Sequence, residues 1–106
     1  MAISPMRKGA TGPDMDLQFT YDSGQTYDLT GVNQATIFVY FYNNDTQVET
    51  LGGGTCTIAN TTNGEVMYAF GPNDTAIVGR FDVRPQFTSV AGKIIKPDAQ
   101  ALLIKP

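Results

Sequence analysis

The side chains that could carry acid–base, nucleophilic or metal chemistry are few in this sequence and lie far apart. There is no histidine, so the usual general base near neutral pH and the commonest metal ligand are both missing. The one cysteine, Cys56, alternates with Ile58, which predicts a small core residue rather than a nucleophile. The acidic residues are scattered singly, mostly beside Gly, Asn or Thr, where capping of turns is their ordinary role. The sequence therefore predicts no enzyme, no catalytic residue and no cofactor.

Two acidic turns deserve comparison with calcium loops. Asp45 and Asp74 each stand in an Asn-Asp-Thr triplet, but neither has the dense alternating carboxylates of a calcium site. The segment "GGGT" at 52–55 lacks the lysine of a phosphate-binding loop. The Asn-x-Thr triplets match glycosylation acceptors, although turn-forming Asn and strand-forming Thr explain them without modification. We interpret all of these as turn chemistry and predict no metal site.

The elements that surround these residues are short and follow the period of β-strands. Side chains alternate in "DLQFTY", "TQVETL", "TCTIA", "GEVMYAF" and the long stretch 77–87, and turn signals such as Asn63-Gly64 separate them. Glycines 52–54 are expected to form a flexible link, and Pro85 to sit at a sheet edge or bulge. About eight such strands at this spacing predict an all-β fold, a single antiparallel β-sandwich that is Ig-like or jelly-roll-like, over residues 16–106.

The first 15 residues differ from the rest of the chain. Proline and glycine interrupt any regular pattern there, and Arg7 and Lys8 give this section a net charge opposite to that of the body. One interpretation is a frayed terminus. The other is an extended N-terminal arm, residues 1–15, that becomes ordered on a neighbouring subunit through Ile3, Met6, Arg7 and Lys8.

The segment "ATIFVYFY" at 35–42 is apolar on both faces of an extended chain. If Val39 faces the core, Phe38, Tyr40 and Tyr42 form an aromatic row on the other face. This row is either a docking patch for a partner or a second buried face covered by loops or termini.

Composition limits the partners. The chain of 106 residues has room for one domain, and its net charge of −3 argues against a nucleic-acid partner. The longest apolar run, near Ile37 to Tyr42, is too short to span a membrane, and the N-terminus lacks the apolar stretch of a secretory signal.

Several of these segments together resemble the N-terminal domain of phage upper baseplate proteins. The resemblance covers most of residues 17–90 and includes "LQFTYDSGQTYDLTG", "ATIFVYFY" and "NGEVMYAFGPNDTAIVGRFDVRPQF". The matched positions are turn and core residues: Asp28, Leu29, Gly64, Val66, Tyr68, Gly79, Phe81 and Val83. Family members commonly continue into a coiled coil or a receptor-facing region, whereas this sequence stops at Pro106.

The resemblance implies a structural virion protein of a tailed bacteriophage, a capsid decoration (cement) protein or a tail or baseplate accessory. Its partners would be other virion proteins, the major capsid protein or tail or baseplate subunits, and it would form a homo-oligomer on a particle assembled in the host cytoplasm. The alternative is a carbohydrate-binding or adhesin-type β-sandwich module, with exposed tyrosines as sugar platforms. Such platforms often use tryptophan, which is absent here.

Overall fold

The computed structural model of this chain describes residues 5–21 and 24–106 and is all-β. Its single helical element in these ranges is a 3-10 turn, η1 (Gln34–Thr36). No helix in the described ranges is long and apolar enough to cross a membrane. The strands are β1 (Met6–Arg7), β2 (Met15–Gln18), β3 (Thr20–Tyr21), β4 (Gln25–Thr26), β5 (Phe38–Asn43), β6 (Val48–Leu51), β7 (Thr55–Asn60), β8 (Glu65–Ala69), β9 (Gly79–Thr88), β10 (Ile94–Ile95) and β11 (Gln100–Lys105).

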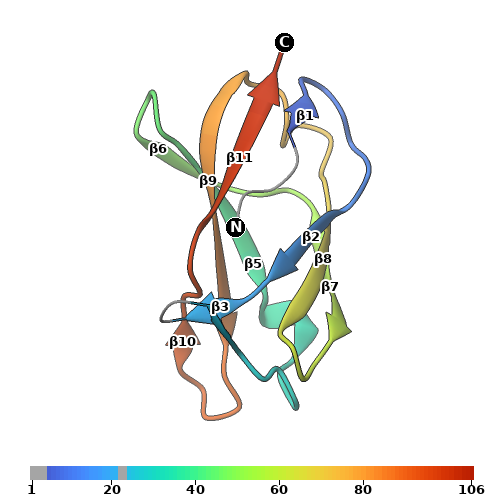
Figure 1. The fold of residues 1–106 in the computed structure, drawn as a ribbon, viewed down its shortest axis with the longest axis vertical. Helices are drawn as coiled ribbons and strands as arrows, with labels where there is room; N and C mark the ends of the chain where they lie inside the picture. Colours follow the sequence, from blue (N-terminus) through green and yellow to red (C-terminus); the bar gives the residue numbers. More distant parts are fainter. Residues whose placement is uncertain (1–4, 22–23) are drawn as a thin grey trace.

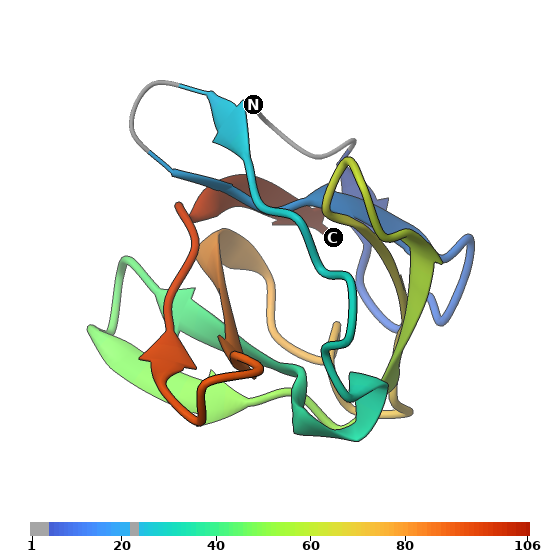
Figure 2. The ribbon, with the colours of Figure 1, turned by 90° about the horizontal axis from the view of Figure 1, so that it is seen from below.

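Two sheets pack face to face as the predicted sandwich. The larger has the order β1-β11-β9-β5-β6, with β10 added on β9, and the smaller has the order β2-β8-β7. Among the described residues, all strand pairings are antiparallel except that of β1 with β11. Figure 2 shows β7 and β8 on one side of the molecule and β5 and β6 on the other. In Figure 1, β6 projects at the upper left, away from β2, β7 and β8.

The core lies between the sheets and follows the alternation of the sequence. Along β9 every second residue is buried, and β8 buries Val66 and Tyr68 in the same way. The fully covered side chains come from both layers, because each strand turns one face inward. The buried hydrophobic residues are Met15, Leu17, Phe19, Leu29, Ile37, Val39, Phe41, Val66, Tyr68, Phe70, Phe81, Val83, Phe87, Leu102 and Ile104.

Pro85 lies in β9, an interior strand of the large sheet. Proline is tolerated there because no strand of the described residues pairs with β9 at this residue on the side away from β5. Pro85 is buried and pairs with Val39 of β5. Since Asn44 donates its N–H to the Arg80 carbonyl, the even-numbered residues of β9 bond to β5. The backbone of Pro85 therefore faces the gap between β11, which ends at Gln100, and β10. Pro85 therefore lies beside a local edge of the sheet, in agreement with the expected position at an edge or bulge. Its missing N–H removes no hydrogen bond between strands.

The segment "TYDLTG" at 26–31 contributes little to the sheets. Within the described residues, β4 (Gln25–Thr26) pairs with β3 (Thr20–Tyr21) and ends at Thr26. Asp28 then ends the extended run, because its carboxylate accepts hydrogen bonds from the N–H of Thr30 at 2.9 Å and from its hydroxyl at 2.6 Å. This turn places Leu29 in the core with no exposed surface.

Cys56 is half-buried on β7 and packs against the core, which agrees with its predicted structural role. Burial raises the pKa of its thiol to about 11 from an ordinary value of 9.0. At pH 9 the folded chain should therefore contain roughly 50-fold less thiolate than the unfolded chain. We expect alkylation by iodoacetamide at pH 9 to be slower by a similar factor in the native protein than in guanidinium chloride.

The same shift has a consequence for stability. The unfolded thiol ionises first as the pH rises, so Cys56 should lower the free energy of unfolding between pH 9 and pH 11 and have no effect below that window. Substitution by alanine removes this part of the pH dependence. Equal alkylation rates in the native and denatured protein would contradict the burial of this thiol.

Candidate binding groove

The residues predicted to form an arm bind the chain's own body. Met6 is half-buried against the core, and β1 pairs in parallel with Ile104–Lys105. Arg7 is exposed and donates to the carbonyl of Pro106 at 3.5 Å, and the N–H of Lys8 donates to the Lys105 carbonyl at 2.7 Å. Ile3 lies outside the described residues. Met6, Arg7 and Lys8 thus act as contacts within this chain, and a contact with a neighbouring subunit stays a prediction.

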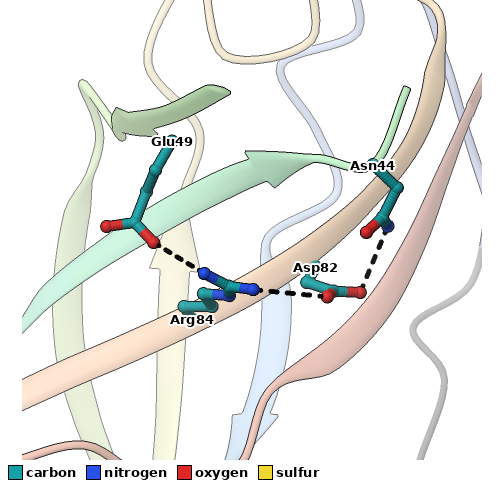
Figure 3. A network of polar contacts seen from close by, with 4 residues as sticks. All are labelled: Asn44, Glu49, Asp82 and Arg84. Carbon is teal, nitrogen blue, oxygen red and sulfur yellow. Dashed lines mark hydrogen bonds and ion pairs between the residues drawn. The ribbon is translucent and has the colours of Figure 1, made fainter. Parts of the chain in front are cut away.

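The aromatic row is on the outer face of the large sheet, as the alternation predicts. Phe38 is exposed, Tyr40 and Tyr42 are half-buried, and Val39 on the other face is buried. Arg84 lies 4.0 Å from the ring centroid of Tyr42. Its guanidinium also forms ion pairs with Glu49 at 3.1 Å and Asp82 at 3.8 Å, and Asn44 donates to Asp82 (Figure 3). A polar network therefore covers part of this row, which leaves Phe38 as its most exposed member.

An apolar groove lies on the inner face of β5 and β6, opposite the face that carries the aromatic row. It has a volume of about 700 Å³, and its lining is mostly apolar. One wall is the hairpin of residues 43–51, the other is the loop 72–77, and Phe41 and Phe81 form the floor. We call this feature the apolar groove; its lining residues are Phe41, Asn43, Thr46, Val48, Thr50, Leu51, Gly53, Pro72, Asn73, Asp74, Ile77 and Phe81.

The groove exists because β6 extends beyond the smaller sheet. All four residues of β6 are exposed, although Val48 and Thr50 pair with Asn43 and Phe41, which are buried. Since paired residues point to the same face of a sheet, Val48 and Thr50 face inward over space that no strand of the smaller sheet covers. Val48, Leu51 and Ile77 remain 55%, 51% and 62% exposed on the rim.

A set of hydrogen bonds around Asp74 fixes the loop wall. Its carboxylate accepts hydrogen bonds from the N–H of Gly53 at 2.8 Å, from the N–H of Gly71 at 2.8 Å, and from the hydroxyl of Tyr68. The same hydroxyl accepts from the N–H of Gly54 at 2.8 Å. Burial and the bond to Asp74 raise the pKa of Tyr68, so its hydroxyl stays protonated at every physiological pH.

These bonds correct the expectation of a flexible glycine link at 52–54. A Cβ added at Gly54 would lie 1.8 Å from the carbonyl oxygen of Ala69. At Gly52 it would lie 2.3 Å from the Tyr68 hydroxyl oxygen. Gly52 and Gly54 lack side chains because neighbouring backbone and Tyr68 approach them closely, so this segment is packed in place rather than flexible.

The least exposed polar side chains of the groove, Asn43 and Asp74, already have partners within the chain. Asn43 is 7% exposed, and its side-chain oxygen accepts from the N–H groups of Asp45 at 2.9 Å and Thr46 at 3.2 Å. Asp74 holds the three donors described above. No buried side-chain polar atom of the described residues lacks a hydrogen-bond partner. The groove can therefore take up an apolar group, and it offers no activated nucleophile or base.

Metal ligands are also lacking. No group of three His, Cys, Asp or Glu side chains that could hold a metal ion occurs within residues 5–21 and 24–106. Asp45 and Asp74, compared above with calcium loops, belong to different walls and different hydrogen-bond sets. The Asp74 carboxylate attaches its loop, whereas Asp45 takes part in its turn through its backbone N–H, which donates to Asn43.

Sequence reasoning did not find the groove. Its residues come from three segments predicted to be strands, from the glycine link at 52–54 and from the turn and loop residues between them. A weak signal was present, because Val48 and Leu51 have opposite parity in "TQVETL" and cannot both point into one core. The sequence does not show which of the faces of this strand remains open, since that depends on the length of the opposing sheet.

No protein-family model and no curated protein sequence matches this chain. Its fold is similar to that of CopC from Methylosinus trichosporium OB3b, with a TM-score of 0.51 at 15% sequence identity. The match covers 99% of this chain and 93% of that chain. It supports the β-sandwich, and at this identity it concerns the fold alone.

The structural match contradicts the prediction of a virion structural protein. The similar fold is that of CopC from Methylosinus trichosporium OB3b, and no comparison yields a capsid, tail or baseplate protein. The assignments to capsid decoration and baseplate are therefore wrong; they depended on core and turn positions that any such sandwich must supply. The resemblance to the upper baseplate domain, the particle location and the virion partners are not tested and stay predictions. What the comparisons show is that this chain is a β-sandwich with the fold of CopC.

Proposed function

We propose that this chain is a non-catalytic binding domain whose apolar groove receives apolar side chains of a protein partner. The observation that carries the proposal is an open, mostly apolar groove of about 700 Å³ whose least exposed polar side chains, Asn43 and Asp74, are already hydrogen-bonded within the chain. Ligand sites commonly fall in this size range and are lined mainly by apolar side chains. The CopC likeness is restricted to the fold, so no ligand is transferred from it.

The chemistry of the groove favours an apolar side chain over a small polar metabolite. A polar metabolite needs free donors and acceptors to orient it, and here Asn43 and Asp74 are occupied by backbone N–H groups. The rim instead offers Val48, Leu51 and Ile77, a set of exposed apolar side chains of the kind that marks interaction sites. Its acidic walls also argue against a nucleic-acid partner.

Capped single amino acids test this proposal directly by NMR. N-acetyl-leucinamide and N-acetyl-phenylalaninamide should shift the amide signals of Val48, Thr50, Asp74 and Phe81 in a saturable manner, with millimolar affinity. N-acetyl-lysinamide should shift these signals much less, because burying its ammonium group against the apolar lining would cost solvation free energy. Scattered shifts, or none with the apolar probes, would exclude the groove as a binding site.

A filled groove provides the matched comparison. Thr50→Phe places a ring over Phe41 and should abolish the shifts induced by N-acetyl-leucinamide, because the added side chain occupies the same space. Thr57→Phe makes the same change at an exposed position of β7 outside the groove and should leave them intact. Retained binding in Thr50→Phe would place the apolar site elsewhere.

A further inference from the structure

We infer that the partner is an extended segment that adds a strand to the free edge of β6, and that its side chains alternate between apolar residues in the groove and basic residues on the other face. This inference deepens the proposed function and rests on it. It names both the mode of recognition and the chemistry of the partner.

The backbone of β6 leaves hydrogen-bonding groups free. β6 is the last strand of its sheet and pairs only with β5 among the described residues. The N–H of Gly52 donates to the carbonyl of Val39 at 2.8 Å. This bond shows which alternate residues of this segment form hydrogen bonds with β5. Residues 48, 50 and 52 therefore bond to β5, and Glu49 and Leu51 direct their N–H and C=O groups outward. These groups are the template that an added strand requires.

The two faces of β6 select different side chains in the added strand. Val48 and Thr50 face the groove, so neighbouring side chains of the partner on that face would lie over its apolar lining. Glu49 faces the opposite side, where its carboxylate contacts Arg84. An opposite charge beside Glu49 is the favourable cross-strand pair, and a second acid there would be repelled.

Charge complementarity identifies the partner as basic. The two segments that form the walls, residues 43–51 and 71–78, contain Asp45, Glu49 and Asp74 and no Lys or Arg. Arg84 compensates Glu49, but no ion pair is found for Asp45 among the described residues. The resulting negative potential attracts a cationic segment and repels a second copy of this acidic chain.

Selection from a surface-displayed library of random twelve-residue peptides tests the inference. We expect enriched sequences with apolar residues at every second position and Lys or Arg between them. Apolar peptides without this alternation, acidic peptides, or no enrichment would overturn it. If the chain alone formed a dimer and the edge-strand substitution Glu49→Pro blocked that dimer, the inference would also be overturned, because β6 would then pair with a second copy.

Backbone methylation of the best peptide separates strand addition from simple insertion of a side chain. N-methyl groups at every second residue should weaken binding about tenfold or more, and those at the intervening residues much less, because only alternate N–H groups face β6. A uniform effect along the peptide would exclude strand addition. If capped leucine still binds in that case, the proposed function stands and only this inference fails.

Variants of the chain give the complementary measurement. Glu49→Pro removes an outward N–H without removing a bond to β5 and should weaken the peptide about tenfold or more. Glu49→Ala removes the same carboxylate but keeps the N–H, and should cost only a few-fold. Binding of N-acetyl-leucinamide should persist in both variants, which shows that they are folded. Equal effects of the two substitutions would contradict backbone pairing.

Discussion

Replacing Gly54 by alanine is expected to destabilise the folded chain by about 3 kcal/mol or more, a large fraction of the roughly 5–15 kcal/mol by which a native protein is stable. The added Cβ would lie 1.8 Å from the Ala69 carbonyl oxygen and 2.7 Å from Cζ of Tyr68. The first of these contacts is backbone in a paired strand, next to the Thr55–Ala69 pair. It cannot move aside without disturbing the pairing of β7 with β8. Urea denaturation followed by far-UV circular dichroism measures the change, since the chain has no tryptophan.

Gly53 provides a matched control within the same glycine run. A Cβ there meets only Oδ1 of Asp74, at 3.6 Å, which is an ordinary contact distance. Its N–H, which donates to Asp74, is unaffected by the change. Gly53→Ala should therefore change the free energy of unfolding by less than about 1 kcal/mol, and a small gain would reflect the lower entropy of the unfolded chain. A loss as small at position 54 as at position 53 would show that the segment is flexible, as its composition suggests.

The second large effect is expected at Asp74. Asp74→Ala removes the acceptor for the N–H groups of Gly53 and Gly71 and for the hydroxyl of Tyr68. Tyr68 is 1% exposed, so its hydroxyl cannot exchange this partner freely for water. Unsatisfied donors of this kind cost about 1–3 kcal/mol each, and we expect a loss of about 3 kcal/mol and a melting temperature lower by roughly 12–24 °C.

Asp45→Ala is the control for this variant because Asp45 has the same neighbours in the sequence. Its carboxylate accepts no hydrogen bond and forms no ion pair that is found in the described part of the chain. We expect this substitution to change the free energy of unfolding by less than about 0.5 kcal/mol. Similar losses for the two variants would mean that the Asp74 bonds do not hold the loop wall.

The Asp74 variant also links stability to function. Loop 72–77 forms one wall of the groove, and the N–H of Gly9 and the hydroxyl of Thr75 connect the loop to the N-terminal segment by bonds of 2.9 Å and 2.6 Å. If Asp74 holds this wall, then partial loss of the wall should weaken N-acetyl-leucinamide binding even at temperatures where the core remains folded. The Asp74 bonds therefore support both the fold and the groove.

The alternation of side chains by itself determined the β-sandwich and most of its strands. Val39 and Phe41 turn inward and Phe38 and Tyr40 outward, as their parity requires, because a strand has only two faces. The Asn63-Gly64 turn between β7 and β8 was predictable for a similar local reason, since Gly64 adopts a positive φ of 65°.

Tertiary structure alone decided the functional features. Asp45 and Asp74 have identical neighbours, yet only Asp74 meets Tyr68 and the packed glycines, which are brought to it by strand pairing. Likewise, β6 is an edge with an uncovered inner face because the opposing sheet ends at β7, a relation between strands far apart in the chain. Local sequence sets which way a side chain points. What lies opposite that side chain depends on packing between layers, which no local pattern encodes.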